Sequence, residues 1–169
     1  FGNEWCPGVD GDRRGVVLNA PFSGAAGYFA SANEYSRLVN PYSNECEIFV
    51  VNVGVLQPDT PGYNSVLAHE FQHLIHWYAD SNEDAWVNEG ASELAEDLNG
   101  FGPPMADIRQ FQLMPNVQLN TWSDDVAELG AHYGAAYLMM RYLLDRFGPD
   151  SLHEVIQSPL NGIDGLQAV

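Results

Sequence analysis

Short apolar runs separated by turn-forming residues dominate the first third of the chain. The runs at 16–18, 27–29 and 47–53 stand between segments rich in Gly, Pro, Asn and Ser. Runs bounded by such breakers are typical of short β-strands joined by turns. The third run holds β-branched and aromatic residues in series, and it is either an edge strand or an ordinary strand of the sheet. The pattern therefore predicts a small N-terminal sheet.

The spacing of apolar residues changes to that of a helix after Pro61-Gly62. Apolar residues recur every three or four positions between 63 and 79, which predicts a helix there. A second helix is predicted from about Glu83-Asp84, because acidic residues suit a helix N-terminus. It is expected to stop at Asn99-Gly100, a good capping pair for a helix C-terminus.

The rest of the chain is also predicted to be mainly helical. Loops with one short helix are predicted over 101–123, a long helix over 124–147 and a last short helix from Pro149. Strands first and helices afterwards indicate an α+β fold. We expect a single domain, present in full or in part, with a β-rich lobe at 1–62 and a helical part at 63–169.

Composition narrows the classes of partner. The chain has 169 residues, of which 46% are hydrophobic, and this is enough for one folded core. No apolar run is long enough to span a membrane. The net charge is −17, with six Arg and no Lys, so nucleic acid and anionic membranes are poor partners.

Candidate metal chemistry is concentrated in the helix predicted over 63–79. His69-Glu70-Phe71-Gln72-His73 is an HExxH motif. His69 and His73 are four residues apart, so their imidazoles share one helical face and can bind one metal ion. Glu70 can point beside the metal and act as general base on a water molecule there. The alternative is a surface helix that carries two histidines by chance.

A catalytic zinc site needs a third protein ligand and one open position. The extended motif HExxHxxGxxH would supply a third histidine, but His76 and Ala79 stand where it needs Gly and His. The other route takes a glutamate from the next helix. Glu89, in Asn88-Glu89-Gly90, lies sixteen positions after His73 and fits a helix, a tight turn and an antiparallel return. Glu89 is therefore the predicted third ligand.

Glu93 and two further histidines remain to be placed relative to this predicted site. Glu93 follows Glu89 by one helical turn, and zinc-binding histidines commonly donate their second N–H to a carboxylate. We therefore expect Glu93 to hold His69, the alternative being a solvated carboxylate. His76 is interpreted as a supporting or packing histidine, and His153 as a surface residue.

The stretch from Leu67 to Glu96 resembles the gluzincins, the zinc metallopeptidases whose third ligand is Glu. Residues 86–90 are similar to the Trp-x-Asn-Glu-Gly pattern of zinc aminopeptidases, and the Glu89/Glu93 pair resembles thermolysin. The segments at 133–138, 141–143 and 147–148 are similar to hyicolysin-like neutral peptidases and related peptidase-MA-like domains.

This resemblance covers roughly 63–157 and implies a zincin-like domain. Carried over residue by residue, it implies Zn²⁺ ligands at His69, His73 and Glu89, with Glu70 as base and acid. It also implies a Tyr or His that stabilises the oxyanion, as acyl-transfer sites commonly use a donor side chain. The family favours Tyr133, and His132 is the alternative. Tyr133 and Tyr137 can also be core aromatics four residues apart.

The expected function is that of a secreted zinc endopeptidase with protein or peptide substrates. The Gly-x-Met-Glu-Asn segment of similar aminopeptidases does not occur in the sequence, which favours an endopeptidase over an exopeptidase. Two alternatives are a zinc aminopeptidase-like exopeptidase and an inactive binding or adhesion module with structural zinc. A third is a catalytic fragment whose substrate pocket needs sequence beyond Val169.

The sequence leaves two questions open: whether its two cysteines form a disulfide, and whether one acidic turn binds a cation. Cys6 and Cys46 are too far apart in sequence for a CxxC motif. In a secreted protein they can form one disulfide, and otherwise they are two unrelated thiols. Asp10-Gly11-Asp12 resembles the start of a calcium loop but lacks the later ligands of an EF-hand, so Ca²⁺ is the second cation considered.

Overall fold

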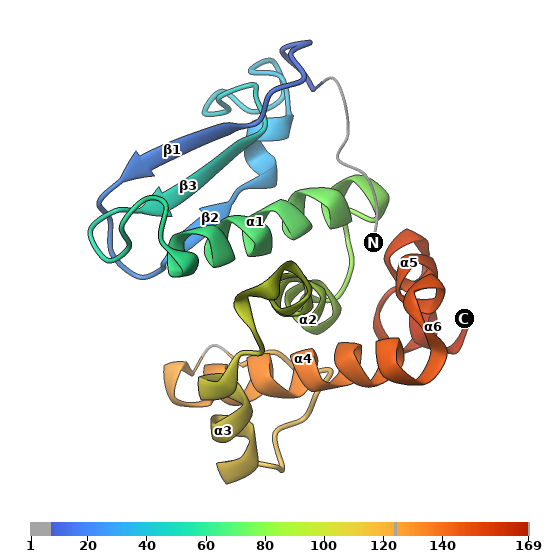
Figure 1. The fold of residues 1–169 in the computed structure, drawn as a ribbon. Coiled ribbons are helices and arrows are strands. Elements are labelled where there is room, and N and C mark those ends of the chain that lie inside the picture. Colours follow the sequence, from blue (N-terminus) through green and yellow to red (C-terminus); the bar gives the residue numbers. More distant parts are fainter. Residues whose placement is uncertain (1–7, 124, 169) are drawn as a thin grey trace.

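The computed structural model describes residues 8–123 and 125–168 and has an α+β architecture. A small sheet lies on α1 (Pro61–Ala79), α2 (Ala85–Glu96) lies on the other side of α1, and α4 (Val126–Phe147) packs against α2 (Figure 1). The predicted α+β order is confirmed. The Cys6–Cys46 pair cannot be compared with it, because Cys6 lies outside the described residues.

The sheet has three strands among the described residues, in the order β1-β3-β2. β1 (Val16–Ala20) pairs parallel with β3 (Ile48–Asn52), and β2 (Gly27–Phe29) pairs antiparallel with it. β3 is therefore the central strand, and its interpretation as an edge strand is wrong. Both of its sides carry a partner strand and all five of its residues are buried, which suits its apolar sequence.

The helical elements agree closely with the apolar spacing. α1, α2 and α4 begin and end within about two residues of the predicted bounds, except at the end of α2, where the short π-helical segment η2 (Asp97–Phe101) follows directly. A short 3₁₀ helix and α6 have no counterpart in the predictions. The elements not yet given bounds are η1 (Ser31–Glu34), α3 (Met105–Leu113), α5 (Pro149–Gln157) and α6 (Gly162–Gln167).

Helix ends follow local capping chemistry. Thr60 caps α1 by accepting a hydrogen bond from the backbone N–H of Tyr63, and Pro61 occupies the first turn. Asp125 caps α4 in the same way through the N–H of Ala127 at 2.9 Å. Gly148 ends α4 with a φ of 88°, a backbone conformation that favours glycine. These caps therefore account for where α1 and α4 begin and where α4 ends.

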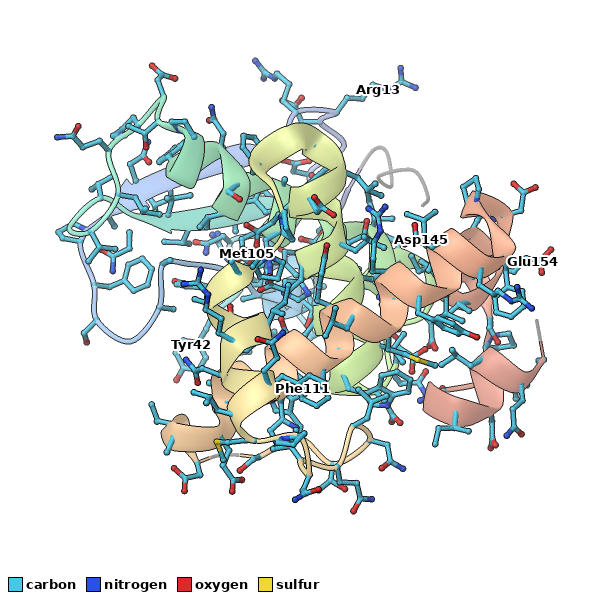
Figure 2. The ribbon with its side chains drawn as sticks, turned by 60° about the horizontal axis from the view of Figure 1, so that its bottom comes forward. Arg13, Tyr42, Met105, Phe111, Asp145 and Glu154 are labelled. Carbon is cyan, nitrogen blue, oxygen red and sulfur yellow. The ribbon has the colours of Figure 1, made fainter. Side chains whose placement is uncertain are left out.

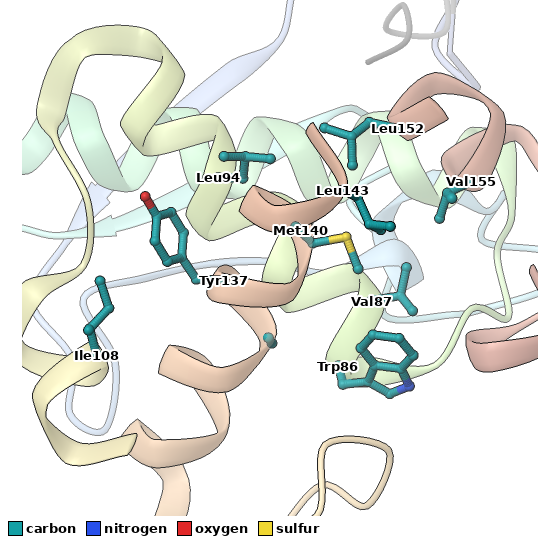
Figure 3. Packing of buried hydrophobic residues seen from close by; sticks show 10 residues of the cluster. Trp86, Val87, Leu94, Ile108, Tyr137, Met140, Leu143, Leu152 and Val155 are labelled. Carbon is teal, nitrogen blue, oxygen red and sulfur yellow. The ribbon is translucent and has the colours of Figure 1, made fainter. Parts of the chain in front are cut away.

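The main apolar core lies between α2 and α4 and is closed by α3 and α5 (Figure 3). Among the described residues, none of the helices combines the length and the apolar character needed to cross a membrane. The core cluster consists of Trp86, Val87, Leu94, Ile108, Ala136, Tyr137, Met140, Leu143, Leu152 and Val155.

Gly90 allows α2 to approach α4 closely. A Cβ at this position would lie 2.7 Å from the carbonyl oxygen of Ala136 and 3.0 Å from Cγ of Met140. The first contact is with backbone, which can move only if α4 shifts. The glycine after Glu89 is therefore explained by packing, and this packing sets the position of the helix that carries Glu89.

We expect Gly90→Ala to lower the free energy of unfolding by about 1–3 kcal/mol, because the added methyl overpacks the α2–α4 contact. Gly62→Ala is the matched control, since its Cβ would meet only Cδ2 of Leu56, at 3.6 Å. That variant should be as stable as the parent chain or slightly more stable. Urea unfolding of both variants measures the difference, and equal stability would contradict the packing argument.

Candidate metal centre

α1 and α2 bring His69, His73 and Glu89 to one point. Nε2 of His69 lies 3.2 Å from Oε2 of Glu89, and Nε2 of His73 lies 3.5 Å from the same oxygen. One ligand atom from each residue falls within 4.8 Å of the others, so the three can hold one metal ion. The two imidazoles come from successive turns of α1, and the carboxylate comes from the facing helix.

The second nitrogen of each imidazole is tied to another side chain. Nδ1 of His69 lies 2.9 Å from Oε1 of Glu96, and Nδ1 of His73 lies 2.8 Å from Oδ1 of Asn88. Both oxygens are acceptors, so each Nδ1 carries the proton and donates it. Both Nε2 atoms then face Glu89, and Nε2 of His69 is close enough to donate a hydrogen bond to that carboxylate. A metal ion bound here would take the place of the proton on Nε2.

Glu96, and not Glu93, makes the short contact with His69. Oε1 of Glu93 lies 3.7 Å from Nδ1 of His69, beyond a good hydrogen bond, whereas Glu96 also accepts from the hydroxyl of Ser65. The role predicted for Glu93 therefore passes to Glu96. The solvated alternative for Glu93 is wrong as well, because this side chain is buried.

His69, Glu93 and Glu96 form a second group whose ligand atoms lie within 4.8 Å of one another. It lies on the Nδ1 side of the same imidazole. Burial and the charge of Glu96 raise the pKa of Glu93 to about 8, so Glu93 holds a proton at neutral pH. A protonated carboxyl is a poor metal ligand, and the group containing His73 and Glu89 is the better candidate.

The electrostatics of the site favour a positive charge. Burial opposes a charged His69, but hydrogen bonds to Glu89 and Glu96 outweigh it and raise the pKa of His69 to about 10. Burial likewise opposes the charge of Glu89, yet His69 and His73 lower the pKa of that carboxyl. Glu89 therefore keeps its negative charge where the two imidazoles meet it. A cation that replaces the proton of His69 would be stabilised by the same carboxylates.

Glu70 lies beside this group and not within it. Its Oε2 accepts a hydrogen bond of 2.8 Å from the backbone N–H of Phe29, so β2 holds the carboxyl in place. Burial raises its pKa, although the charges of His73 and His69 act in the opposite direction. A carboxyl whose pKa is raised toward neutrality can both take up and release a proton.

A cleft of about 330 Å³ opens at this point between β2, α1, α2 and α4. Burial and the charge of Glu89 raise the pKa of Tyr133, which keeps its hydroxyl protonated and able to donate. The cleft is lined by Gly24, Ala25, Ala26, Gly27, Val66, His69, Glu70, Glu93, Glu96, Leu129 and Tyr133.

The other candidate side chains on α4 have different surroundings. His132 lines a separate pocket of about 530 Å³ and packs against Trp122, with ring centroids 5.6 Å apart. The hydroxyl of Tyr137 donates to Asp97 at 2.8 Å, within the core between helices. Of the three, only Tyr133 shares the cleft with Glu70.

The two remaining histidines lie outside the site. His76 is fully buried, and neither ring nitrogen has a partner within the described part of the chain. Burial lowers its pKa to about 4, so it is a neutral packing residue at ordinary pH. His153 is exposed on α5, as predicted.

Asn88, Glu96 and Ser92 were not predicted as parts of this site. Ser92 approaches Nδ1 of His73 at 3.2 Å, beside the contact with Asn88. Glu96 follows Glu89 by seven residues, and this two-turn spacing was a usable signal for a residue on the same face of α2. No such signal distinguishes Asn88, whose role depends on how α2 faces α1.

No family model matches this chain, and neither does any curated protein sequence. The resemblance to gluzincins therefore rests on the sequence motifs alone.

If this group binds a divalent metal ion, we expect Glu96→Gln to weaken the affinity for added Zn²⁺ by about 10- to 100-fold, because it removes the charge that orients His69. Glu93→Gln should change the affinity much less, since Glu93 lies farther from the imidazole. Competition with a chromogenic chelator gives both affinities. A larger loss for Glu93→Gln than for Glu96→Gln would show that the assignment is reversed.

Proposed function

We propose that this chain is a zincin-like catalytic domain of a secreted zinc endopeptidase of the gluzincin type. The observation that carries the proposal is the pair of imidazoles whose Nδ1 atoms are tied back, so that both Nε2 atoms turn toward Glu89. Glu70 and Tyr133 line the cleft beside them. The extracellular location rests on the family resemblance alone.

The donor set fits zinc better than a hard cation. Two imidazole nitrogens and one carboxylate oxygen are typical zinc ligands, and three protein ligands leave a position open for catalysis. Zinc bound there would polarise a peptide carbonyl and lower the pKa of a water molecule. Structural zinc sites usually fill all four positions with protein ligands, which argues against an inactive module that uses zinc only as a clamp.

Glu70 is the proposed general base and acid. Its carboxyl is oriented by the N–H of Phe29, and burial raises its pKa toward the range in which it can exchange protons. It takes a proton from the attacking water and passes that proton to the amine that leaves. This shuttle uses one residue for both proton transfers of peptide hydrolysis.

Tyr133 is the proposed donor to the oxyanion. It lines the cleft from α4, and burial together with the charge of Glu89 raises its pKa and keeps its hydroxyl protonated. A neutral hydroxyl can donate a hydrogen bond to the negative charge that develops on the carbonyl oxygen. His132 is the weaker alternative because it lines a different pocket.

The substrate is proposed to lie along β2. Residues 24–27 line the cleft, and β2 pairs with β3 on one side only among the described strands. An extended peptide can add to such an edge through main-chain hydrogen bonds. This role was considered for the strand at 47–53, but β3 has partners on both sides. Such an edge can pair with an internal stretch of the substrate chain, which favours an endopeptidase over an exopeptidase.

We expect Glu70→Gln to lower the rate of casein cleavage by about 10²- to 10⁴-fold while zinc stays bound, because only the proton shuttle is lost. Zinc content by atomic absorption and cleavage of labelled casein are measured on the same samples. Glu154→Gln, an exposed carboxylate on α5, is the control and should be fully active. Undiminished cleavage by zinc-loaded Glu70→Gln protein would exclude this mechanism.

We expect Tyr133→Phe to lower kcat by about 10²- to 10³-fold with little change in KM, as for loss of an oxyanion donor. Tyr137→Phe removes a hydroxyl from the same helix that is bonded to Asp97, so it should cost stability and leave kcat intact. Steady-state kinetics on a quenched peptide compares the two. Equal kcat values for Tyr133→Phe and the parent chain would transfer the role to another group.

A further inference from the structure

The indole of Trp122 packs on the ring of Tyr133, the proposed donor to the oxyanion. Their ring centroids lie 5.0 Å apart and the planes are inclined by 84°, which is an edge-to-face contact. Such a contact attracts the positive edge of one ring to the negative face of the other, so it favours a fixed orientation of both rings. Trp122 belongs to the loop between α3 and α4, whose described residues are 114–123. A loop residue thus contacts the side chain that lines the cleft from α4.

Trp122 is itself held in place by other neighbours. Its indole also meets the imidazole of His132, with ring centroids 5.6 Å apart and planes inclined by 44°. The same side chain packs against the main apolar core, among the partly buried residues around it. Since a ring packed on several sides has little freedom to turn, Trp122 can serve as a fixed support for Tyr133.

The backbone of α4 has little freedom to move near Tyr133, because α3 packs closely against it. A Cβ at Gly134 would collide with the backbone carbonyl of Asp107, so the two helices are in direct contact there. Figure 2 shows α3, labelled at Met105 and Phe111, against the first half of α4. With the backbone fixed in this way, the position of the Tyr133 hydroxyl depends on the side-chain torsions of that residue.

The other neighbour of the Tyr133 hydroxyl is a predicted metal ligand. Burial opposes the charge of Glu89, and hydrogen bonds from His69 and, more weakly, from the hydroxyl of Tyr133 lower the pKa of that carboxyl. A metal ion would compete with the tyrosine for this carboxylate. The contact with Trp122 involves only the ring of Tyr133 and leaves its hydroxyl free to donate.

We propose that Trp122 is a positioning residue, whose indole holds the ring of Tyr133 so that the hydroxyl faces the cleft. Trp122 is not among the residues that line the cleft, so it acts through Tyr133. A donor to a developing negative charge is effective when it is held in place before the reaction, and not when it must first be ordered. This role rests on the proposed function, because it concerns the same oxyanion step.

We expect Trp122→Leu to lower kcat by about 10- to 100-fold with little change in KM, because a tyrosine that turns freely presents its hydroxyl to the oxyanion only part of the time. Trp122→Phe keeps an aromatic edge against Tyr133 and should retain most of the parent kcat. Steady-state kinetics on a quenched peptide measures these values, with each rate divided by the concentration of folded, zinc-loaded chain.

A double-mutant cycle separates a positioning role from a purely structural one. In the Tyr133→Phe background the hydroxyl is already absent, so Trp122→Leu should lower kcat no further. A Trp122 that only stabilises the fold would lower kcat by the same factor in both backgrounds, or in neither.

Trp77→Leu is the matched control. Trp77 is also a partly buried indole in edge-to-face contact with a tyrosine, Tyr35, with 5.7 Å between the ring centroids. Neither of these two side chains lines the cleft. The variant should therefore lose a comparable aromatic contact and keep the kcat of the parent chain.

A second measurement does not depend on catalysis. The ring signals of Tyr133 in the NMR spectrum of the tyrosine-labelled chain are assigned by their absence from Tyr133→Phe. They should move in Trp122→Leu, because the ring current of the neighbouring indole is lost, and stay in place in Trp77→Leu. The spectra are recorded with and without added Zn²⁺, since the contact between the two rings does not require the ion.

Three outcomes would overturn the inference. If Trp122→Leu leaves the Tyr133 signals in place, the two rings are not in contact. If the parent chain is active but Trp122→Leu keeps its kcat, or loses the same factor in both backgrounds, only the role of Trp122 fails. If the zinc-loaded parent chain cleaves no peptide, the proposed function itself fails. Trp122→Met, whose flexible side chain fills irregular space, replaces Trp122→Leu if that variant does not fold.

Discussion

An imidazole has two nitrogens, and the site depends on which of them is free. On α1, His69 and His73 donate through Nδ1 to side chains of α2, so both Nε2 atoms face Glu89. α2 thus supplies one ligand, Glu89, and also the two side chains that orient the histidine ligands of α1. Without these two hydrogen bonds each ring could rotate, and the three ligand atoms would have no common point.

This constraint in turn requires that α2 lie at a fixed distance from α1. α2 is packed between α1 and α4, and Gly90 lets it approach the backbone of α4 at Ala136. α4 also carries Tyr133 into the cleft, and β2 holds Glu70 from the opposite side. The sheet and the helices therefore each contribute one part of the proposed chemistry. The core between α2 and α4 keeps these two helices in a fixed relative position.

Features that depend on a single helix could be predicted from the sequence. The shared face of His69 and His73 follows from their spacing, and the position of Glu89 follows from a short turn between two helices. The partner of His69 could not be chosen in the same way, because Glu93 and Glu96 lie on the same side of α2. Which of them reaches the imidazole depends on how α1 and α2 cross.

Features that depend on long-range pairing were also beyond the sequence. The central position of β3 results from pairing with β1 and β2, and its apolar run suits an edge or a centre equally. His132 and Tyr133 are adjacent on α4, so they point about 100° apart and the rotation of that helix decides which enters the cleft. α6 was not predicted, since it has only six residues and two of them are glycines.

The central claim is that a zinc ion binds on the Nε2 side of both histidines. A crystal structure of the zinc-loaded chain, with anomalous difference density recorded at the zinc edge, tests it most directly. The account predicts one strong peak about 2.0–2.2 Å from Nε2 of His69, Nε2 of His73 and a carboxylate oxygen of Glu89. A peak on the Nδ1 side of His69, between Glu93 and Glu96, or no peak at either position, would contradict it.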